Sequence, residues 1–218
     1  LSESKVDLPD MERVARRVSD FHRQAETGGR IDENGRRDVI RKNQDENFEQ
    51  TEKYIGMTIP EEKYRFLQSF INAFMDRNRA LFERRVKEHR IRDCHGDLHI
   101  EHICLADGIV IFDCIEFNER FRFGDVAAEV AFLAMDLDYN GYGTWAESFV
   151  EAYIRHSGDP DIRWLLNFYR CYYAYVRGKV VGFRIKDPVI GDRERTEAKA
   201  TAAHYFDLAF TYAARPER

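Results

Sequence analysis

The sequence has few cysteines and no cysteine motif. Only four of its 218 residues are cysteine, at positions 94, 104, 114 and 171, and no two of them form a C-x-x-C pair. The spacing of ten residues between the first three does not match a zinc site. The N-terminal segment, L-S-E-S-K, also lacks the basic and apolar regions of a secretory signal. We therefore expect a cytoplasmic protein with reduced thiols, in which any bound metal would be held by histidine and carboxylate groups.

Long apolar runs and a surplus of positive charge are also absent. Charged residues interrupt every apolar run before it reaches the ~20 residues that a membrane helix needs. Lys and Arg number 34 against 39 Asp and Glu, and the resulting net charge of −5 argues against nucleic acid and membranes as partners. Apolar residues make up 44% of the chain and aromatic residues 13%, enough for a substantial core. We expect one globular domain over residues 1–218.

Most of the chain shows the three- and four-residue spacing of amphipathic helices. Met11, Val14 and Val18 follow this pattern in a helix expected over residues 10–25, and a single long helix is expected over residues 60–82. Residues 30–50 are strongly charged, which favours a solvated loop followed by the start of a polar helix. The other segments expected to be helical are residues 125–137, 144–156, 161–184 and 192–214.

The periodicity changes in the middle of the chain. Two short apolar segments, residues 103–105 and 109–113, flank the dipeptide Asp107-Gly108. An Asp-Gly turn between such segments is typical of a β-hairpin. The chain is thus predicted to be mainly α, of the α+β type, with one small hairpin at its centre.

Reactive side chains concentrate around this hairpin. Residues 95–102 contain three histidines and two carboxylates, and Asp113 and Glu116 follow the second predicted strand. Loops that present many titratable groups on a rigid scaffold are typical of functional sites. The loop before one strand of a hairpin and the residues after the next strand can lie at the same end. His102 and Asp113 are therefore expected to share a site.

Three motifs in this region resemble the aminoglycoside phosphotransferase family, which has the protein-kinase-like fold. Residues 95–102 (H-G-D-L-H-I-E-H) are similar to the family's catalytic loop, H-G-D-x-H-x-x-N. Residues 111–116 (I-F-D-C-I-E) are similar to its metal-binding segment, and residues 123–129 (F-G-D-V-A-A-E) to its G-D-x-x-x-D-L-A helix start. The motifs occur in the family's order, which makes the signal specific. The resemblance implies a protein-kinase-like C-terminal helical lobe, in which the hairpin carries the catalytic loop.

The resemblance also implies a role for each matching residue. Asp97 would accept the proton of the substrate hydroxyl during phosphoryl transfer, and His95 would orient the loop. Asp113 would bind the metal ion that bridges the nucleotide phosphates, and Asp125 would hold backbone amides of the loop. The implied cofactor is ATP or GTP with Mg²⁺ or Mn²⁺, and the implied partner is a small molecule with a hydroxyl group. The further candidates, two metal ligands and one supporting side chain, are His102, Glu116 and His99.

The sequence departs from the family pattern in two ways. His102 stands where the family has Asn, and a neutral imidazole suits Mn²⁺ or Zn²⁺ better than Mg²⁺. No G-x-G-x-x-G loop or V-A-I-K-like strand precedes the helical part, and no Walker A motif is present. We therefore expect a C-terminal lobe with little activity alone. Its N-terminal lobe, and in a bacterial branch of the family a fused P-loop domain, would belong to a longer parent protein.

Two other functions stay open at this stage. A catalytically inactive, pseudokinase-like lobe with a regulatory or interaction role would account for the missing N-terminal lobe and for His102. A metallophosphoesterase would account for Gly96-Asp97-x-His99, which is similar to the opening motif of calcineurin-like phosphatases. The remaining phosphatase motifs are absent from the sequence, which disfavours this second alternative.

Overall fold

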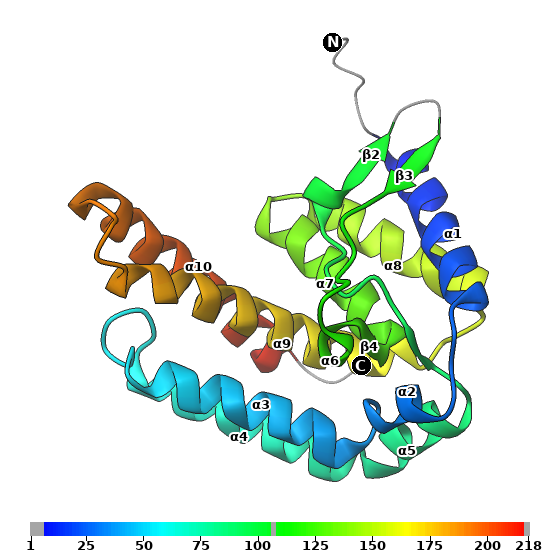
Figure 1. Ribbon diagram of the computed structural model, residues 1–218, viewed down its shortest axis with the longest axis horizontal. Coiled ribbons are helices and arrows are strands. Elements are labelled where there is room, and N and C mark those ends of the chain that lie inside the picture. The colour runs from blue at the N-terminus through cyan, green and yellow to red at the C-terminus, as the bar shows by residue number, and fades with distance from the viewer. Residues whose placement is uncertain (1–6, 106–107, 216–218) are drawn as a thin grey trace. The chain divides into compact units, whose positions relative to one another are not determined.

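The computed structural model describes residues 7–105 and 108–215, which form two compact units (Figure 1). The first unit combines residues 7–35 and 85–166, and the second combines residues 36–84 and 167–215. The expectation of one domain over residues 1–218 stays a prediction.

The described chain is mainly helical, as predicted, with short strands only in the first unit. The helices of that unit are α1 (Leu8–Gln24), α2 (Arg30–Glu33), the 3-10 helix η1 (Ile100–His102), α6 (Glu119–Arg122), α7 (Val126–Tyr139) and α8 (Gly143–Ser157). Its strands are β1 (Ile91–Asp93), β2 (Ile103–Leu105), β3 (Ile109–Ile111) and β4 (Phe123–Asp125). The second unit contains α3 (Arg37–Glu52), α4 (Glu61–Arg77), the 3-10 helix η2 (Arg184–Lys186) and α10 (Asp192–Ala214). The boundaries between the units fall between α2 and α3, within α5 (Arg79–Lys87) and within α9 (Ile162–Phe183).

The core of the first unit forms around α7. This helix is apolar on almost every side, and eleven of its fourteen residues are buried, because α8 and other elements cover it. α1 packs its apolar face, which includes Val14 and Val18, against α8 (Figure 1). Two of the buried α7 residues are the carboxylates Glu129 and Asp136. A carboxylate is buried at a cost unless it is paired, so both should have specific partners.

The predicted hairpin is present, and a second strand pair accompanies it. β2 and β3 are antiparallel, with Ile103 opposite Ile111. Of the predicted Asp107-Gly108 turn, Asp107 lies outside the described residues. β1 and β4 form the other antiparallel pair, with Ile91 opposite Asp125. This pair was not predicted, because each strand has three residues, too few for an alternating pattern, and its partner lies about thirty residues away.

The polar helix expected to begin within residues 30–50 is present, but the loop expected before it is limited to residues 34–36. The rest of the segment forms α2 and most of α3, and α3 buries Phe48 together with the polar residues Gln44 and Asn47. The helix is stable despite its charge because it packs on α4, where Arg37 and Arg41 both pair with Asp76. Polar contacts with a neighbouring helix thus replace the apolar face that the sequence lacks there.

The predicted long helix over residues 60–82 is in fact two helices. α4 ends at Arg77 and α5 begins at Arg79, with Asn78 between them at φ −102° and ψ 24°. The side-chain amide of Asn78 donates to the carbonyl of Phe74 at 3.0 Å. Asparagine favours helix ends because its side chain bonds nearby backbone groups. The apolar spacing continues across the break, and for this reason periodicity alone does not reveal it.

The second unit has an aromatic core. The rings of Phe74 and Phe168 stack at 4.7 Å between centroids, and those of Tyr175 and Phe206 meet edge to face at 5.1 Å. Such pairs add about 0.5–1.5 kcal/mol each beyond their buried area.

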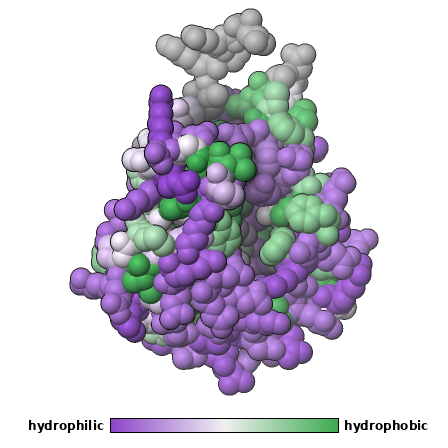
Figure 2. Space-filling model, turned by 60° about the vertical axis from the view of Figure 1, so that its left-hand side comes forward, coloured by the Kyte–Doolittle hydropathy of each residue, from purple (hydrophilic) through white to green (hydrophobic). Residues whose placement is uncertain are grey.

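Figure 2 shows one face of the molecule, mainly hydrophilic with separate hydrophobic patches. Among the described helices, none has both the length and the apolar character that a membrane crossing requires.

Candidate functional site

The candidate loop, residues 94–102, lies between β1 and β2 and is tied at several points to the segment that runs from β3 to β4. The amide of Cys94 donates to the carbonyl of Arg122 at 3.1 Å, and the amide of Ile115 donates to the carbonyl of His95 at 3.0 Å. The amide of Phe112 donates to the carbonyl of His102 at 3.1 Å. These hydrogen bonds hold the motif of residues 95–102 against the motif of residues 111–116.

Gly96 is required by the geometry of the loop. Its φ is +84°, a conformation that other residues rarely adopt. A Cβ at this position would also lie 2.8 Å from the carbonyl oxygen of Phe121. The amide of Gly96 donates to Oε1 of Glu129 at 2.6 Å. Because Gly96 has no side chain, the loop backbone can approach both the backbone of Phe121 and the buried carboxylate of Glu129.

His95 fixes the loop through both ring nitrogens. The amide of Asp97 donates to Nδ1 at 3.3 Å, so the proton of the neutral ring is on Nε2. Nε2 in turn donates to the carbonyl of Phe112 at 2.8 Å. The ring is buried. His95 thus links the Asp97 amide to the Phe112 carbonyl, and its role in orienting the loop stays a prediction.

His102 presents its free ring nitrogen to Asp113. A carbonyl oxygen can only accept, so the 2.8 Å contact between Nδ1 and the carbonyl of Asp97 places the proton on Nδ1. The lone pair of the neutral ring is then on Nε2, which lies 3.4 Å from Oδ2 of Asp113. Metal-binding histidines commonly have their other nitrogen fixed in this manner.

Two accessible carboxylates face these imidazoles. The side chain of Asp97 is 36% exposed, and its Oδ2 lies 3.6 Å from Nε2 of His99 and 3.7 Å from Nδ1 of His102. The side chain of Asp113 is 75% exposed. Its φ of +62° is unusual for a residue other than glycine. The structure thus brings Asp97, His99, His102 and Asp113 together, as the motifs predict for a shared site.

Other predicted site residues lie elsewhere. Glu116 is exposed on the segment between β3 and α6 and makes no hydrogen bond or ion pair within the described part of the chain. Asp125 does not hold loop amides as expected. Its carboxylate instead accepts from the amide of Ala127 at 2.8 Å, where it caps α7, and from the guanidinium of Arg85. As the first residue before a helix, Asp125 is bound to the backbone beside it.

Glu129 and Asp136 hold the loop in its place. Glu129 accepts from the amide of Gly96, and Asp136 accepts from the amide of Ile100 at 2.9 Å. They lie seven residues apart on α7, so they project from the same face of the helix, toward the two ends of the loop. Neither role was predicted from the sequence. The signal that could have revealed them is the presence of two carboxylates within an otherwise apolar helix.

The electrostatics keep Glu129 ionised. Burial raises the pKa of Glu129, but the hydrogen bond and charge of His22 and the amides of Gly96 and His95 outweigh it and lower the pKa below its ordinary value. Burial, together with the nearby carboxylates, has the opposite effect on Cys94 and raises the pKa of its thiol well above the usual range. Cys94 therefore stays a neutral thiol, 3.5 Å from the carbonyl of Gly124.

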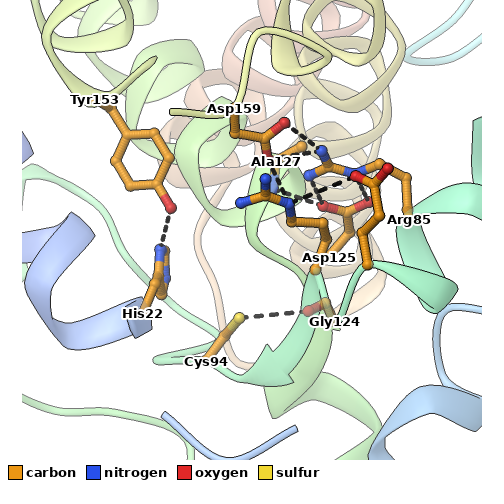
Figure 3. Close-up of polar contacts among 10 residues, drawn as sticks. His22, Arg85, Cys94, Gly124, Asp125, Ala127, Tyr153 and Asp159 are labelled. Carbon is orange, nitrogen blue, oxygen red and sulfur yellow. Dashed lines mark hydrogen bonds and ion pairs between the residues drawn. The ribbon is translucent and has the colours of Figure 1, made fainter. Parts of the chain in front are cut away.

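A buried ion network supports the strand and helix behind the loop. Arg85 is fully buried and lies between Asp125 and Asp159 (Figure 3). Burial lowers the pKa of Arg85, but the charges and hydrogen bonds of both carboxylates outweigh it and raise the pKa. Arg85 therefore stays charged and joins three segments that are distant in sequence: the end of α5, the start of α7 and the turn after α8.

Two groups of side chains have the donors for a metal ion within the described residues. One is Asp97, His99 and His102 at the candidate site, beside Asp113. The other is His22, Cys94 and Glu129, which is buried. Only the first group reaches the surface, through Asp97.

Comparison with known proteins shows the family to which the chain belongs. A family model described as "Phosphotransferase enzyme family" matches residues 11–166, a range that contains the whole loop and both of its carboxylate supports. The chain therefore belongs to this phosphotransferase family, and the predicted resemblance and kinase-like helical lobe are confirmed. No solved structure matches the sequence significantly.

The relatives found among curated proteins are uncharacterized. The protein Rv2004c of Mycobacterium tuberculosis and the protein Mb2027c of Mycobacterium bovis are each 30% identical to this chain over 200 residues. The match covers 91% of this chain but 39% of each relative, so the chain spans about two fifths of their length.

Proposed function

We propose that the chain takes part in phosphoryl transfer from a nucleoside triphosphate, ATP or GTP, to a hydroxyl group of a small molecule. The observation that carries this proposal is the arrangement of three side chains at one end of the hairpin. The partly exposed carboxylate of Asp97 lies beside His102, whose free nitrogen faces the exposed carboxylate of Asp113 at 3.4 Å. Family membership supports the reaction class.

The donor set fits a divalent cation. Asp113 offers carboxylate oxygen, which both Mg²⁺ and Mn²⁺ accept, and His102 offers imidazole nitrogen, which favours Mn²⁺. We propose these two residues as ligands, with Glu116 as a further candidate from the adjoining segment. When bound, the ion would neutralise charge on the nucleotide phosphates.

The chain's own groups would position and deprotonate the acceptor. Asp97 would accept a hydrogen bond from the substrate hydroxyl and take its proton as the phosphoryl group is transferred. His95 would hold the loop so that this carboxylate points outward, through its contacts with the Asp97 amide and the Phe112 carbonyl. Most of the rate enhancement in such reactions comes from positioning and charge neutralisation, and this small set of groups is sufficient for both.

We further propose that nucleotide affinity depends on a longer protein. The curated relatives are longer than this chain, which supports a longer parent protein whose additional residues cover the nucleotide. A P-loop domain is a candidate for part of those additional residues. The chain alone is then expected to bind the metal ion but to hold nucleotide weakly and turn over little.

Binding of Mn²⁺ to the chain tests the proposal without requiring a substrate. Electron paramagnetic resonance measures free Mn²⁺ directly. We expect binding that weakens at least about tenfold in Asp113→Ala, because a ligand is lost. Asp45→Ala, which changes an exposed carboxylate on α3, is the matched control and should leave binding unchanged.

The preference between metals tests His102 separately. His102→Asn replaces the imidazole nitrogen by an amide, and we expect the ratio of Mn²⁺ to Mg²⁺ affinity to fall. Equal Mn²⁺ binding in the wild type and in Asp113→Ala would contradict the proposed site. If, in addition, the full-length parent bound no nucleotide with any metal, a non-enzymatic role for this lobe would replace the proposal.

A further inference from the structure

Three polar side chains from three different helices meet beneath the catalytic loop. His22 on α1, Glu129 on α7 and Tyr153 on α8 are each at most 4% exposed. Nδ1 of His22 lies 2.7 Å from the hydroxyl of Tyr153, and Nε2 lies 2.6 Å from Oε2 of Glu129. Figure 3 shows the His22 ring pointing toward the Tyr153 hydroxyl, with Cys94 nearby.

Glu129 connects this group to the loop. Its Oε2 bonds His22, and its Oε1 accepts from the amide of Gly96, next to Asp97. A glutamate side chain has three rotatable bonds, and a hydrogen bond to one oxygen leaves much of that freedom. With each oxygen held by a different partner, the carboxylate plane and therefore the position of the Gly96 amide are fixed.

A metal ion does not explain this group of side chains. Two ligands of a tetrahedral ion with bonds of ~2.0–2.1 Å lie roughly 3.3 Å apart. Nε2 of His22 and Oε2 of Glu129 are only 2.6 Å apart, which is the distance of a direct, charge-assisted hydrogen bond. Cys94, the third potential ligand, is directed instead to the carbonyl of Gly124.

We propose that His22 is a positioning residue for the catalytic loop. Through Glu129 it holds the Gly96 amide, and thereby the backbone from which Asp97 reaches the substrate. Tyr153 orients the His22 ring from the other side. The effect on turnover rests on the proposed phosphoryl transfer, whereas the effect on the loop itself does not.

Two substitutions of His22 separate the two hydrogen bonds. His22→Gln places an amide nitrogen near the position of Nε2 and keeps a donor for Glu129. His22→Asn places its amide near the position of Nδ1, so it keeps the hydrogen bond to Tyr153 and loses the hydrogen bond to Glu129. The matched control is His156→Gln, because His156 on α8 bonds Glu12 on α1 at 2.6 Å and thus joins the same two helices away from the loop.

Amide hydrogen exchange at Gly96, measured by nuclear magnetic resonance on this chain, is the first readout. We expect exchange to be at least about tenfold faster in His22→Asn and close to wild type in His22→Gln and His156→Gln, with α8 amides unchanged in all three. Unchanged Gly96 exchange in His22→Asn would overturn the proposal. Equal acceleration in all three variants would also overturn it, since it would indicate a general loss of helix packing.

Steady-state kinetics of nucleotide turnover in the full-length protein is the second readout. We expect His22→Asn to lower kcat by about ten- to a hundredfold while the KM for nucleotide changes less than about twofold, and His22→Gln to recover most of kcat. Loss of affinity without loss of kcat would overturn the positioning role. If Gly96 exchange behaves as expected but the wild-type protein has no turnover, the proposed function fails and the structural link stands.

Discussion

Removal of Arg85 should be among the most damaging single changes to the first unit. The Arg85 side chain is fully buried, and its guanidinium reaches Asp125 at 2.6 Å and Asp159 at 2.6 Å. Both carboxylates are at most 4% exposed. Arg85→Met keeps much of the side-chain volume but leaves two buried negative charges without their main partner.

The magnitude follows from these contacts. Breaking a buried ion pair by removing one partner costs about 3–5 kcal/mol, because the remaining charge is uncompensated. Nε of Arg90 lies 3.6 Å from Asp159 and would offset part of the loss on that side, so we expect a destabilisation of about 3 kcal/mol. The exposed pair between Arg163 and Glu151 provides the control, since water screens it and Arg163→Ala should therefore change the stability far less than Arg85→Met does.

The assay can be restricted to the first unit. Both tryptophans of the chain, Trp145 and Trp164, belong to that unit, so urea unfolding followed by tryptophan fluorescence reports on it. The double variant Arg85→Met/Asp125→Asn should recover part of the loss, because it removes one unpaired charge and keeps a residue that caps α7 well. A loss below about 1 kcal/mol in Arg85→Met, or no recovery in the double variant, would refute the reasoning.

Two further predictions concern the loop and the cysteines. Gly96→Ala should abolish most Mn²⁺ binding by the chain, because a Cβ would lie 2.8 Å from a backbone carbonyl at a φ of +84°; near-normal binding in this variant would show that the loop tolerates the change. Of the four thiols, Cys104 and Cys114 should react with Ellman's reagent in the native protein, whereas Cys94 and Cys171 should react only after denaturation, because burial raises the pKa of both thiols and hides them. Four fast-reacting thiols in the native state would contradict the described burial.

Several parts of the fold and the site follow from local sequence. The apolar spacing of Val14 and Val18 predicts the buried face of α1, and the hairpin is predicted by two short apolar segments around an Asp-Gly dipeptide. The hairpin also predicts that His102 and Asp113 lie at the same end, and their side chains approach to 3.4 Å. These predictions succeed because each depends on neighbours within a few residues, or on a short hairpin that places its own ends together.

Other parts depend on contacts that local pattern does not encode. α3 is helical because α4 lies beside it and supplies Asp76, and the break at Asn78 leaves the apolar spacing intact. The β1–β4 pair joins strands separated by the entire candidate loop and the hairpin. For α3 and for the β1–β4 pair, a partner far away in the sequence decides between structures that the local residues permit equally.

The sequence by itself therefore determined which chemical groups the candidate site carries: the acid Asp97 and the imidazoles of the loop, and the acid Asp113 after the hairpin. Only the tertiary structure decided which buried carboxylate holds the loop. Asp125 and Glu129 are four residues apart and both negative, but Asp125 caps α7 and binds Arg85, whereas Glu129 lies one turn further along the helix and reaches Gly96. The physical reason is that a hydrogen bond requires a partner at the correct distance and angle, and those partners come from α1, α5 and the loop, each brought there by packing around α7.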